Sequence, residues 1–289
     1  MATLVSRSLP RLRSLVLLSR CGLPGISRCQ WQSTASKSNQ SLSEVIKENY
    51  AARVELAVAY RAMEYYNMHE GVCNHLSLRA PAKDGNGDVM LLLRYGTHWS
   101  QVTASTLIGV DFESGEVIEG VGPVEMSAMN IHRAIHKVKA ADGIKCVMHN
   151  HQPYTTALAC VKGGRLKNIH QNSMIFHNRI SYDLGYGGIP DCDESEHIAK
   201  AFDGKNICIL GNHGVAAVGT RVCDVFNDLY YLERAAMVQV LAMSTGKELW
   251  EVSDEIATEV ANFDFTSYAE AHFNSMKSVL AKVEPDYKS

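Results

Sequence analysis

Apolar residues along the chain change their spacing several times, and each change marks a predicted element. Apolar positions at helical spacing, with charged residues opposite, predict a helix from Ser43 to about Asn67. The same spacing predicts helices from Met126 to about Lys139 and from Cys223 to Ser244, the latter capped by Thr220 or Asp224. Shorter helices are expected from Pro153, over Glu194–Ala201 and in the tail beyond Trp250.

Short apolar runs bounded by turn residues predict strands. One predicted strand ends at Arg79. The others cover Val89–Leu93, Ser105–Asp111, Glu116–Ile118, Ile144–His151, Ile207–Leu210 and Val215–Val218. Lys83–Asp88 and Gly211–Gly214 are predicted hairpin turns, and Asn168–Asp193 is a turn-rich segment that favours a surface loop. Strands interleaved with helices in this way predict a layered α/β domain.

Composition narrows the class of protein. The chain has 289 residues, a formal net charge of -3 and 46% hydrophobic residues, which predicts one large or two small globular domains. This charge balance gives no electrostatic reason to expect nucleic-acid or membrane partners. The eight cysteines form no Cys-x-x-Cys pair, so we expect reduced thiols in a reducing compartment.

The first forty residues differ from the rest. They contain arginine, serine and leucine but no acidic residue before Glu44. This composition is typical of a mitochondrial transit peptide, which we place at residues 1–38 and which predicts a matrix location. A secretory signal is the alternative; the apolar run Leu15–Leu18 is far too short to span a bilayer.

His149 and His151 end the predicted strand that begins at Ile144. Residues two apart on a strand face the same way, so the two imidazoles are expected side by side, as in a metal site that keeps an open position. His213 lies at the tip of the second predicted hairpin, beside Gly214. Chance pairing of His149 with His151, and an isolated turn histidine at position 213, remain the alternatives.

Four segments together resemble the class II aldolase and adducin head-domain family. They are Cys73–Arg79, Gln101–Leu107, Val147–His151 and Ile209–Val215. The resemblance covers roughly residues 43–250 and is strongest to the adducin-like branch. It implies a three-layer α/β/α sandwich around a largely antiparallel mixed sheet, and a homotetramer or other homo-oligomer. The helical pattern of the tail predicts that residues 251–289 are a helical extension of the same domain.

The resemblance also implies a metal centre. The family's ligands correspond to His149, His151 and His213, and zinc is the usual ion, with manganese or another divalent metal as the alternative. In family aldolases the ion stabilises the enediolate that forms when a carbon–carbon bond breaks next to a carbonyl group.

The residue that accepts a proton is harder to assign from the sequence than the metal ligands. The family's catalytic glutamate corresponds to Ala128, and the nearest carboxylate is Glu125, three residues earlier, which is close to one helical turn. Glu125 is therefore the candidate catalytic residue. The alternative is a solvated carboxylate that interacts with the helix dipole.

Candidate substrate-binding residues are Asn74, His75 and Gly96. His75 corresponds to an asparagine that holds phosphate in the family's sugar-phosphate aldolases, so a non-phosphorylated hydroxy or keto substrate becomes plausible; a purely structural histidine is the alternative. Arg94 is a candidate partner for a substrate carboxylate. Tyr182 and Tyr186 are candidate general acids, with structural roles as the alternative.

These observations predict a metal-dependent lyase, acting by retro-aldol cleavage or decarboxylation. Two alternatives stay open. One is a non-catalytic adducin-like scaffold or oligomerisation module, suggested by the displaced glutamate, and the other is a metal-dependent epimerase of the same family.

Overall fold

An eight-stranded sheet forms the middle of the structure. The computed structural model describes residues 40–185, 188 and 192–289, so the predicted transit peptide and Tyr186 lie outside the described residues. The strands are β1 (His75–Pro81), β2 (Asp88–Leu93), β3 (Leu107–Asp111), β4 (Val117–Glu119), β5 (Cys146–Asn150), β6 (Ile180–Asp183), β7 (Ile207–Leu210) and β8 (Gly214–Gly219). Their order is β4-β3-β2-β1-β5-β8-β7-β6. Neighbouring strands of this sheet run antiparallel, except that β6 and β7 are parallel.

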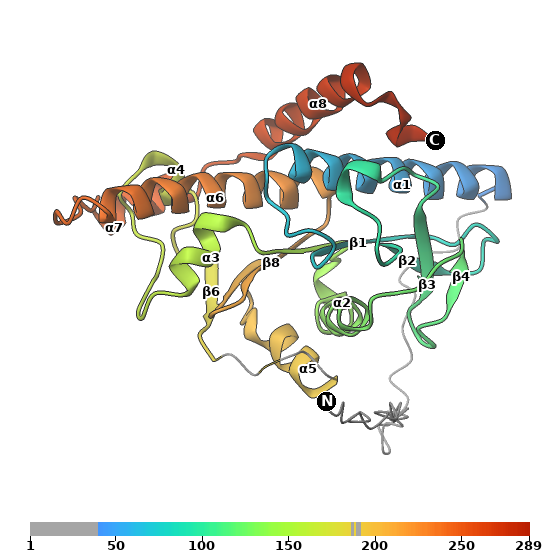
Figure 1. Cartoon of the computed structure of the whole chain (residues 1–289), viewed down its shortest axis with the longest axis horizontal. Coiled ribbons are helices and arrows are strands. Elements are labelled where there is room, and N and C mark those ends of the chain that lie inside the picture. The colour runs from blue at the N-terminus through green and yellow to red at the C-terminus, as the bar shows by residue number, and fades with distance from the viewer. Residues whose placement is uncertain (1–39, 186–187, 189–191) are drawn as a thin grey trace, which may run out of the picture. The chain divides into compact units, whose positions relative to one another are not determined.

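Helices cover both faces of the sheet (Figure 1). They are α1 (Leu42–Tyr65), α2 (Met126–Val138), α3 (Pro153–Ala159), α4 (Gln171–Met174), α5 (Cys192–Ala201), α6 (Val222–Met243), α7 (Asp254–Ala261) and α8 (Thr266–Val283). Helices α1 and α6 lie along one face and α8 packs outside them, whereas α2 and α5 pack together on the other face. The predicted α/β fold with a largely antiparallel mixed sheet is confirmed.

The central strand β5 contributes to a different core on each face. Cys146 and Met148 join the core beneath α1, α6 and α8. Val147 points the other way, into the smaller core with residues of α2 and α5. Side chains alternate along a strand, so His149 shares the face of Val147, between the sheet and α2.

Helix starts show where local sequence rules held and where they did not. Ser41, two residues before the predicted start at Ser43, caps α1 and forms a capping box with Glu44. The prediction that Thr220 or Asp224 caps the long helix α6 was wrong. Its N-cap is Arg221, whose guanidinium has only donors and makes no side-chain capping bond. The Asp224 carboxylate accepts hydrogen bonds from this guanidinium at 2.6 and 2.8 Å.

Two further features concern the cysteines and the helices. Five of the cysteines that the structure describes are free thiols, namely Cys73, Cys146, Cys160, Cys208 and Cys223. Within the described residues, no helix combines the length and the apolar character needed to cross a bilayer.

Candidate metal centre

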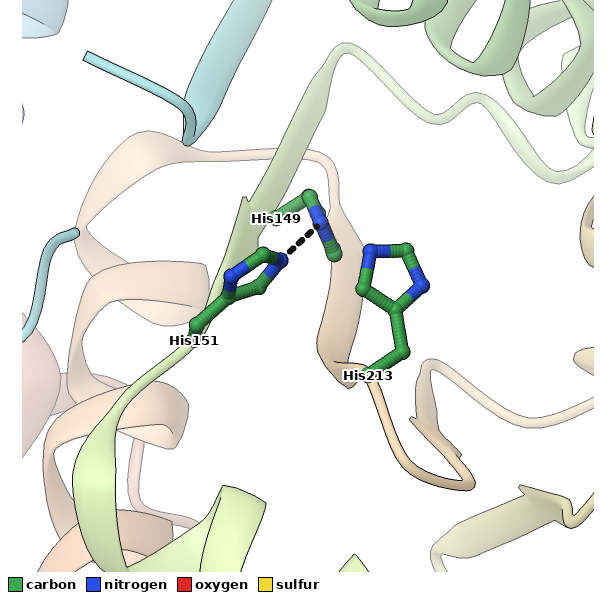
Figure 2. A group of neighbouring side chains, drawn as sticks. All are labelled: His149, His151 and His213. Carbon is green, nitrogen blue, oxygen red and sulfur yellow. Dashed lines mark hydrogen bonds between the residues drawn. The ribbon is translucent and has the colours of Figure 1, made fainter. Parts of the chain in front are cut away.

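Three histidines from two parts of the chain meet at one end of the sheet. His149 lies near the end of β5, His151 follows that strand, and His213 lies in the turn between β7 and β8 (Figure 2). One ring nitrogen from each residue lies within 4.8 Å of the corresponding nitrogens of the other two. His149 is buried, and His151 and His213 are half-buried. The arrangement therefore opens toward solvent on one side.

Strand pairing brings these residues together. β5 and β8 are antiparallel neighbours, with His149 opposite Ala216 and Asn150 opposite Val215. The turn that precedes β8 is consequently held against the end of β5. Gly214 permits this approach, because a Cβ atom there would lie only 2.6 Å from the Asn150 carbonyl oxygen and 2.7 Å from Cδ2 of His151.

Outer hydrogen bonds orient two of the rings. The Nδ1 atom of His149 lies 3.0 Å from the carbonyl oxygen of Val215, and Nδ1 of His151 contacts the Glu70 carboxylate. A carbonyl or carboxylate oxygen accepts a hydrogen bond, so both contacts keep a proton on Nδ1 and leave Nε2 as the donor atom for an ion. The two Nε2 atoms face each other at 3.2 Å.

The surroundings also favour uncharged rings. Burial, together with the neighbouring imidazoles of His75, His213 and His151, holds the pKa of His149 well below its ordinary value. Burial and the adjacent His151 lower the pKa of His213 to about 4. Uncharged imidazoles with free lone pairs are the form that binds a cation.

This donor set fits a divalent metal. Three nitrogen ligands on a fixed scaffold, with one side left open, match the arrangement of a catalytic zinc site. The residues that would hold the ion are His149, His151 and His213, with Glu70 and the Val215 carbonyl fixing two of the rings from behind.

Comparison with known proteins gives the family. The family profile described as "Class II Aldolase and Adducin N-terminal domain" matches residues 54–240. The chain belongs to this family.

Relatives of this class II aldolase and adducin family chain include bacterial and eukaryotic proteins. A putative aldolase class 2 protein of Pseudomonas aeruginosa is 28% identical over 214 residues, covering 74% of this chain and 80% of the relative. An adducin-related protein of Schizosaccharomyces pombe is 31% identical over 248 residues, covering 82% and 72%. Beta-adducin of Homo sapiens is 29% identical over 197 residues, but the match covers 67% of this chain and 26% of beta-adducin.

Solved structures of the family share the fold. An aldolase II superfamily protein from Pseudomonas syringae superposes with a TM-score of 0.77 at 28% identity, covering 86% of this chain and 98% of that one. L-fuculose 1-phosphate aldolase from Glaciozyma antarctica superposes with a TM-score of 0.72 at 24% identity, covering 88% and 97%. At 24% identity, the similarity to L-fuculose 1-phosphate aldolase supports a shared fold and nothing more.

The substrate-side candidates line one small pocket of this family member. Asn74, His75, Gly96 and Glu125 are all in its wall, together with Arg94. Asn74 also braces the histidines, because its Oδ1 accepts from the amides of Glu70 at 2.8 Å and His151 at 3.2 Å. Its Nδ2 is buried without a hydrogen-bond partner among the described residues. The substrate-binding roles of these residues stay predictions.

Glu125 is the N-cap of α2. Its carboxylate accepts from the backbone amides of Ser127 at 3.2 Å and Ala128 at 2.6 Å, and from the Ser127 hydroxyl at 2.5 Å. The helix thus begins early enough for Glu125 to reach the pocket wall, while its oxygens also satisfy the first turn of the helix. Its role as proton acceptor stays a prediction.

The candidate general acid Tyr182 has a local partner. Its hydroxyl accepts a hydrogen bond from the Leu166 amide at 3.1 Å, and the Arg165 guanidinium lies 4.4 Å from its ring centre. The arrangement supplies a structural role for Tyr182, and the catalytic role stays a prediction.

Sequence reasoning missed the polar residues behind the pocket. His132 and His136 project from α2 toward β1, where they contact His75 and Ser77. The spacing indicates that His132 and His136 share one face of the helix and that His75 and Ser77 share one face of the strand, but it does not indicate that the two faces meet. Glu70 was missed because it lies in a turn with no periodic pattern.

Proposed function

We propose that this chain is a metal-dependent lyase that breaks or forms a carbon–carbon bond next to a carbonyl group. The observation that carries the proposal is the convergence of His149, His151 and His213 within 4.8 Å, in a chain of the class II aldolase and adducin family. Similarity to a putative aldolase class 2 protein over 80% of that relative's length supports the same activity class.

Zinc is the proposed ion, with manganese or another divalent metal as the alternative. When bound, the ion supplies Lewis-acid stabilisation of negative charge that develops on substrate oxygens. The chain's own groups then have separate tasks. Glu70 and Val215 hold the rings of His151 and His149, the unpartnered Nδ2 of Asn74 donates a hydrogen bond to the substrate, and Glu125 accepts a proton.

The test starts with metal content. Purified protein is saturated with zinc, dialysed and analysed for zinc per chain. It is then assayed with a panel of hydroxy ketones, hydroxy acids, keto acids and sugar acids. We expect about one zinc per chain and turnover that His213→Ala abolishes together with the zinc. His197→Ala is the control, because that exposed histidine pairs with Asp183 on β6.

A non-catalytic scaffold is the second candidate function. It is favoured by the engagement of the Glu125 carboxylate with three donors and by similarity to beta-adducin. Stoichiometric zinc without turnover on any member of the panel would favour the scaffold, whereas a zinc-free protein would contradict the lyase directly. Formation of an isomer with an unchanged carbon count would instead identify an epimerase.

Location and assembly belong to the same proposal. The arginine-rich, acid-free first forty residues support import into the mitochondrial matrix, and the family resemblance supports a homo-oligomer. Fusing residues 1–40 to a fluorescent reporter tests the first proposal, and sedimentation equilibrium of the purified chain tests the second.

A further inference from the structure

An arginine lies in the wall of the small pocket beside the candidate metal centre. Arg94 lines this pocket together with Asn74 and His75. Oδ1 of Asn74 accepts from the His151 amide at 3.2 Å. The ring of His75 lies next to that of His149, with 4.9 Å between ring centres. A molecule bound in the pocket is therefore close both to Arg94 and to an ion held by the three histidines.

Two neighbours hold the Arg94 side chain in place. Its Nε atom donates to the hydroxyl of Thr97 at 3.1 Å. The Gly122 backbone packs against its aliphatic part, where an added Cβ atom would lie 3.0 Å from Cβ and 3.2 Å from Cδ of Arg94. The two chain segments are joined by a hydrogen bond of 2.9 Å from the Tyr95 amide to the Pro123 carbonyl. The planar guanidinium is thus oriented before a ligand binds, which lowers the entropy lost on binding.

The two terminal nitrogens of Arg94 have no hydrogen-bond or ion-pair partner among the described residues. Glu125 lines the same pocket, but its carboxylate is directed at the first turn of α2, where it accepts from the amides of Ser127 and Ala128. The arginine charge is consequently left for a ligand. Two parallel N–H donors in one plane match a group that presents two oxygen acceptors.

The size of the pocket favours a carboxylate over a phosphate. Its cavity volume is about 20 Å³, which is little more than the space that one water molecule needs. A planar carboxylate places its two oxygens against the guanidinium, whereas a tetrahedral phosphate brings further oxygens that need both room and donors. The other unpartnered donor in the wall, among the described residues, is the buried Nδ2 of Asn74.

We propose that Nη1 and Nη2 of Arg94 bind a carboxylate group of the substrate. The inference rests on the proposed lyase function and narrows its substrate to a hydroxy-carbonyl compound that carries a carboxylate and no phosphate. Arg94 is then a specificity-determining residue, and Thr97 is a positioning residue that orients the guanidinium.

Binding to the zinc-loaded protein is measured by calorimetry with three probes. Hydroxypyruvate, dihydroxyacetone and dihydroxyacetone phosphate share a hydroxymethyl ketone unit, to which they add a carboxylate, a hydroxymethyl group and a phosphorylated hydroxymethyl group. Arg94 is exposed, so the ion pair is partly solvated. We therefore expect hydroxypyruvate to bind about 5- to 20-fold more tightly than dihydroxyacetone.

Variants assign this preference to the arginine. Arg94→Gln should weaken hydroxypyruvate binding by the same factor and leave dihydroxyacetone binding unchanged, and Arg94→Lys should give an intermediate affinity because it keeps the charge without the planar fork. Thr97→Val should weaken hydroxypyruvate binding more than Thr97→Ser, which keeps the acceptor for Nε. Arg234→Gln is the control, because it removes the same charge from the exposed face of α6, outside the pocket wall. Zinc content is measured for every variant.

The outcomes separate this inference from the lyase proposal. A preference for hydroxypyruvate that survives in Arg94→Gln overturns the carboxylate contact, and so do equal affinities in the wild type. Tighter, Arg94-dependent binding of dihydroxyacetone phosphate than of hydroxypyruvate also overturns it. Zinc-dependent turnover with Arg94-independent binding would retain the lyase and contradict the contact. Arg94-dependent binding by a protein that turns over no member of the substrate panel would retain the contact and contradict the lyase.

Discussion

The Nε2 atoms of His149 and His151 face each other at 3.2 Å, although Nδ1 of each ring is directed at an oxygen acceptor. With both protons on Nδ1, two lone pairs point at each other. Such an arrangement is favourable only when a proton or a cation lies between them. The outer acceptors thus prepare the inner nitrogens for an ion.

Removing the outer acceptor of His151 should therefore weaken metal binding without removing a ligand. Glu70→Gln keeps the shape of the side chain but no longer requires the proton to stay on Nδ1. Because the Glu70 side chain is 65% exposed, we expect zinc affinity to fall by about 10-fold, the lower end for outer-shell changes. Competition with a zinc-binding dye measures this effect. Glu259→Gln on the exposed face of α7 should leave affinity unchanged, and equal affinities for all three proteins would refute the prediction.

Glu125 can be tested separately as a helix cap and as a proton acceptor. Glu125→Ser retains a capping oxygen, whereas Glu125→Ala does not, so the alanine variant alone should lose about 1 kcal/mol of unfolding free energy. As the proposed proton acceptor, the residue should be required for turnover, and kcat should fall about 10²- to 10⁴-fold in both variants. Urea unfolding and steady-state kinetics give the two readouts. Full turnover by Glu125→Ser would show that Glu125 acts only as a helix cap and not as a proton acceptor.

A buried ion pair ties the first helix to the edge of the sheet. Nη2 of Arg53 lies 2.6 Å from Oε2 of Glu119, and the side chains are 4% and 7% exposed. Glu119→Gln leaves the Arg53 charge buried without its counter-ion, so we expect a loss of about 3–5 kcal/mol of unfolding free energy.

Glu196→Gln is the matched control for that loss. Glu196 pairs with Lys200 at 3.6 Å on the surface of α5, and this change should stay within about 0.5 kcal/mol. Chemical denaturation measures the unfolding free energy of both variants. Similar losses in the two would contradict the prediction that the buried ion pair stabilises the fold more than the exposed one.

Acidification should destabilise the protein through its buried histidines. His136 has a pKa of about 3 in the folded chain, since burial disfavours its charged form, against about 6.5 when unfolded. Between these values the unfolded chain binds the additional proton, so the free energy of unfolding falls as pH decreases. The slope expected from this one residue is about 1.4 kcal/mol per pH unit.

The comparison that isolates this contribution is wild type against His136→Gln, both metal-free, in urea at pH 6.0, 5.5 and 5.0. The wild type should lose stability more steeply than the variant over that range. Parallel pH dependences would show that His136 takes up its proton without unfolding.

Local sequence rules predicted most of the elements and the shared face of His149 and His151. Alternation along Ile144–His151 predicts the shared face of His149 and His151, and the glycine-flanked turn at His213 predicts a hairpin tip. These features follow from residues only a few positions apart, whose spacing fixes which face of an element a side chain occupies.

Only the tertiary structure decided which elements meet. The chain has 12 histidines, and no local pattern indicates that His75 lies opposite His149 or that His132 and His136 cover the same face from α2. Those neighbours depend on the adjacency of β1 and β5 in the sheet and on the helix packed against them. The sequence therefore indicated His149, His151 and, through the family resemblance, His213 as the candidate metal ligands. Strand order and register decided the groups that orient them, because partners distant in sequence are selected by packing of the whole sheet.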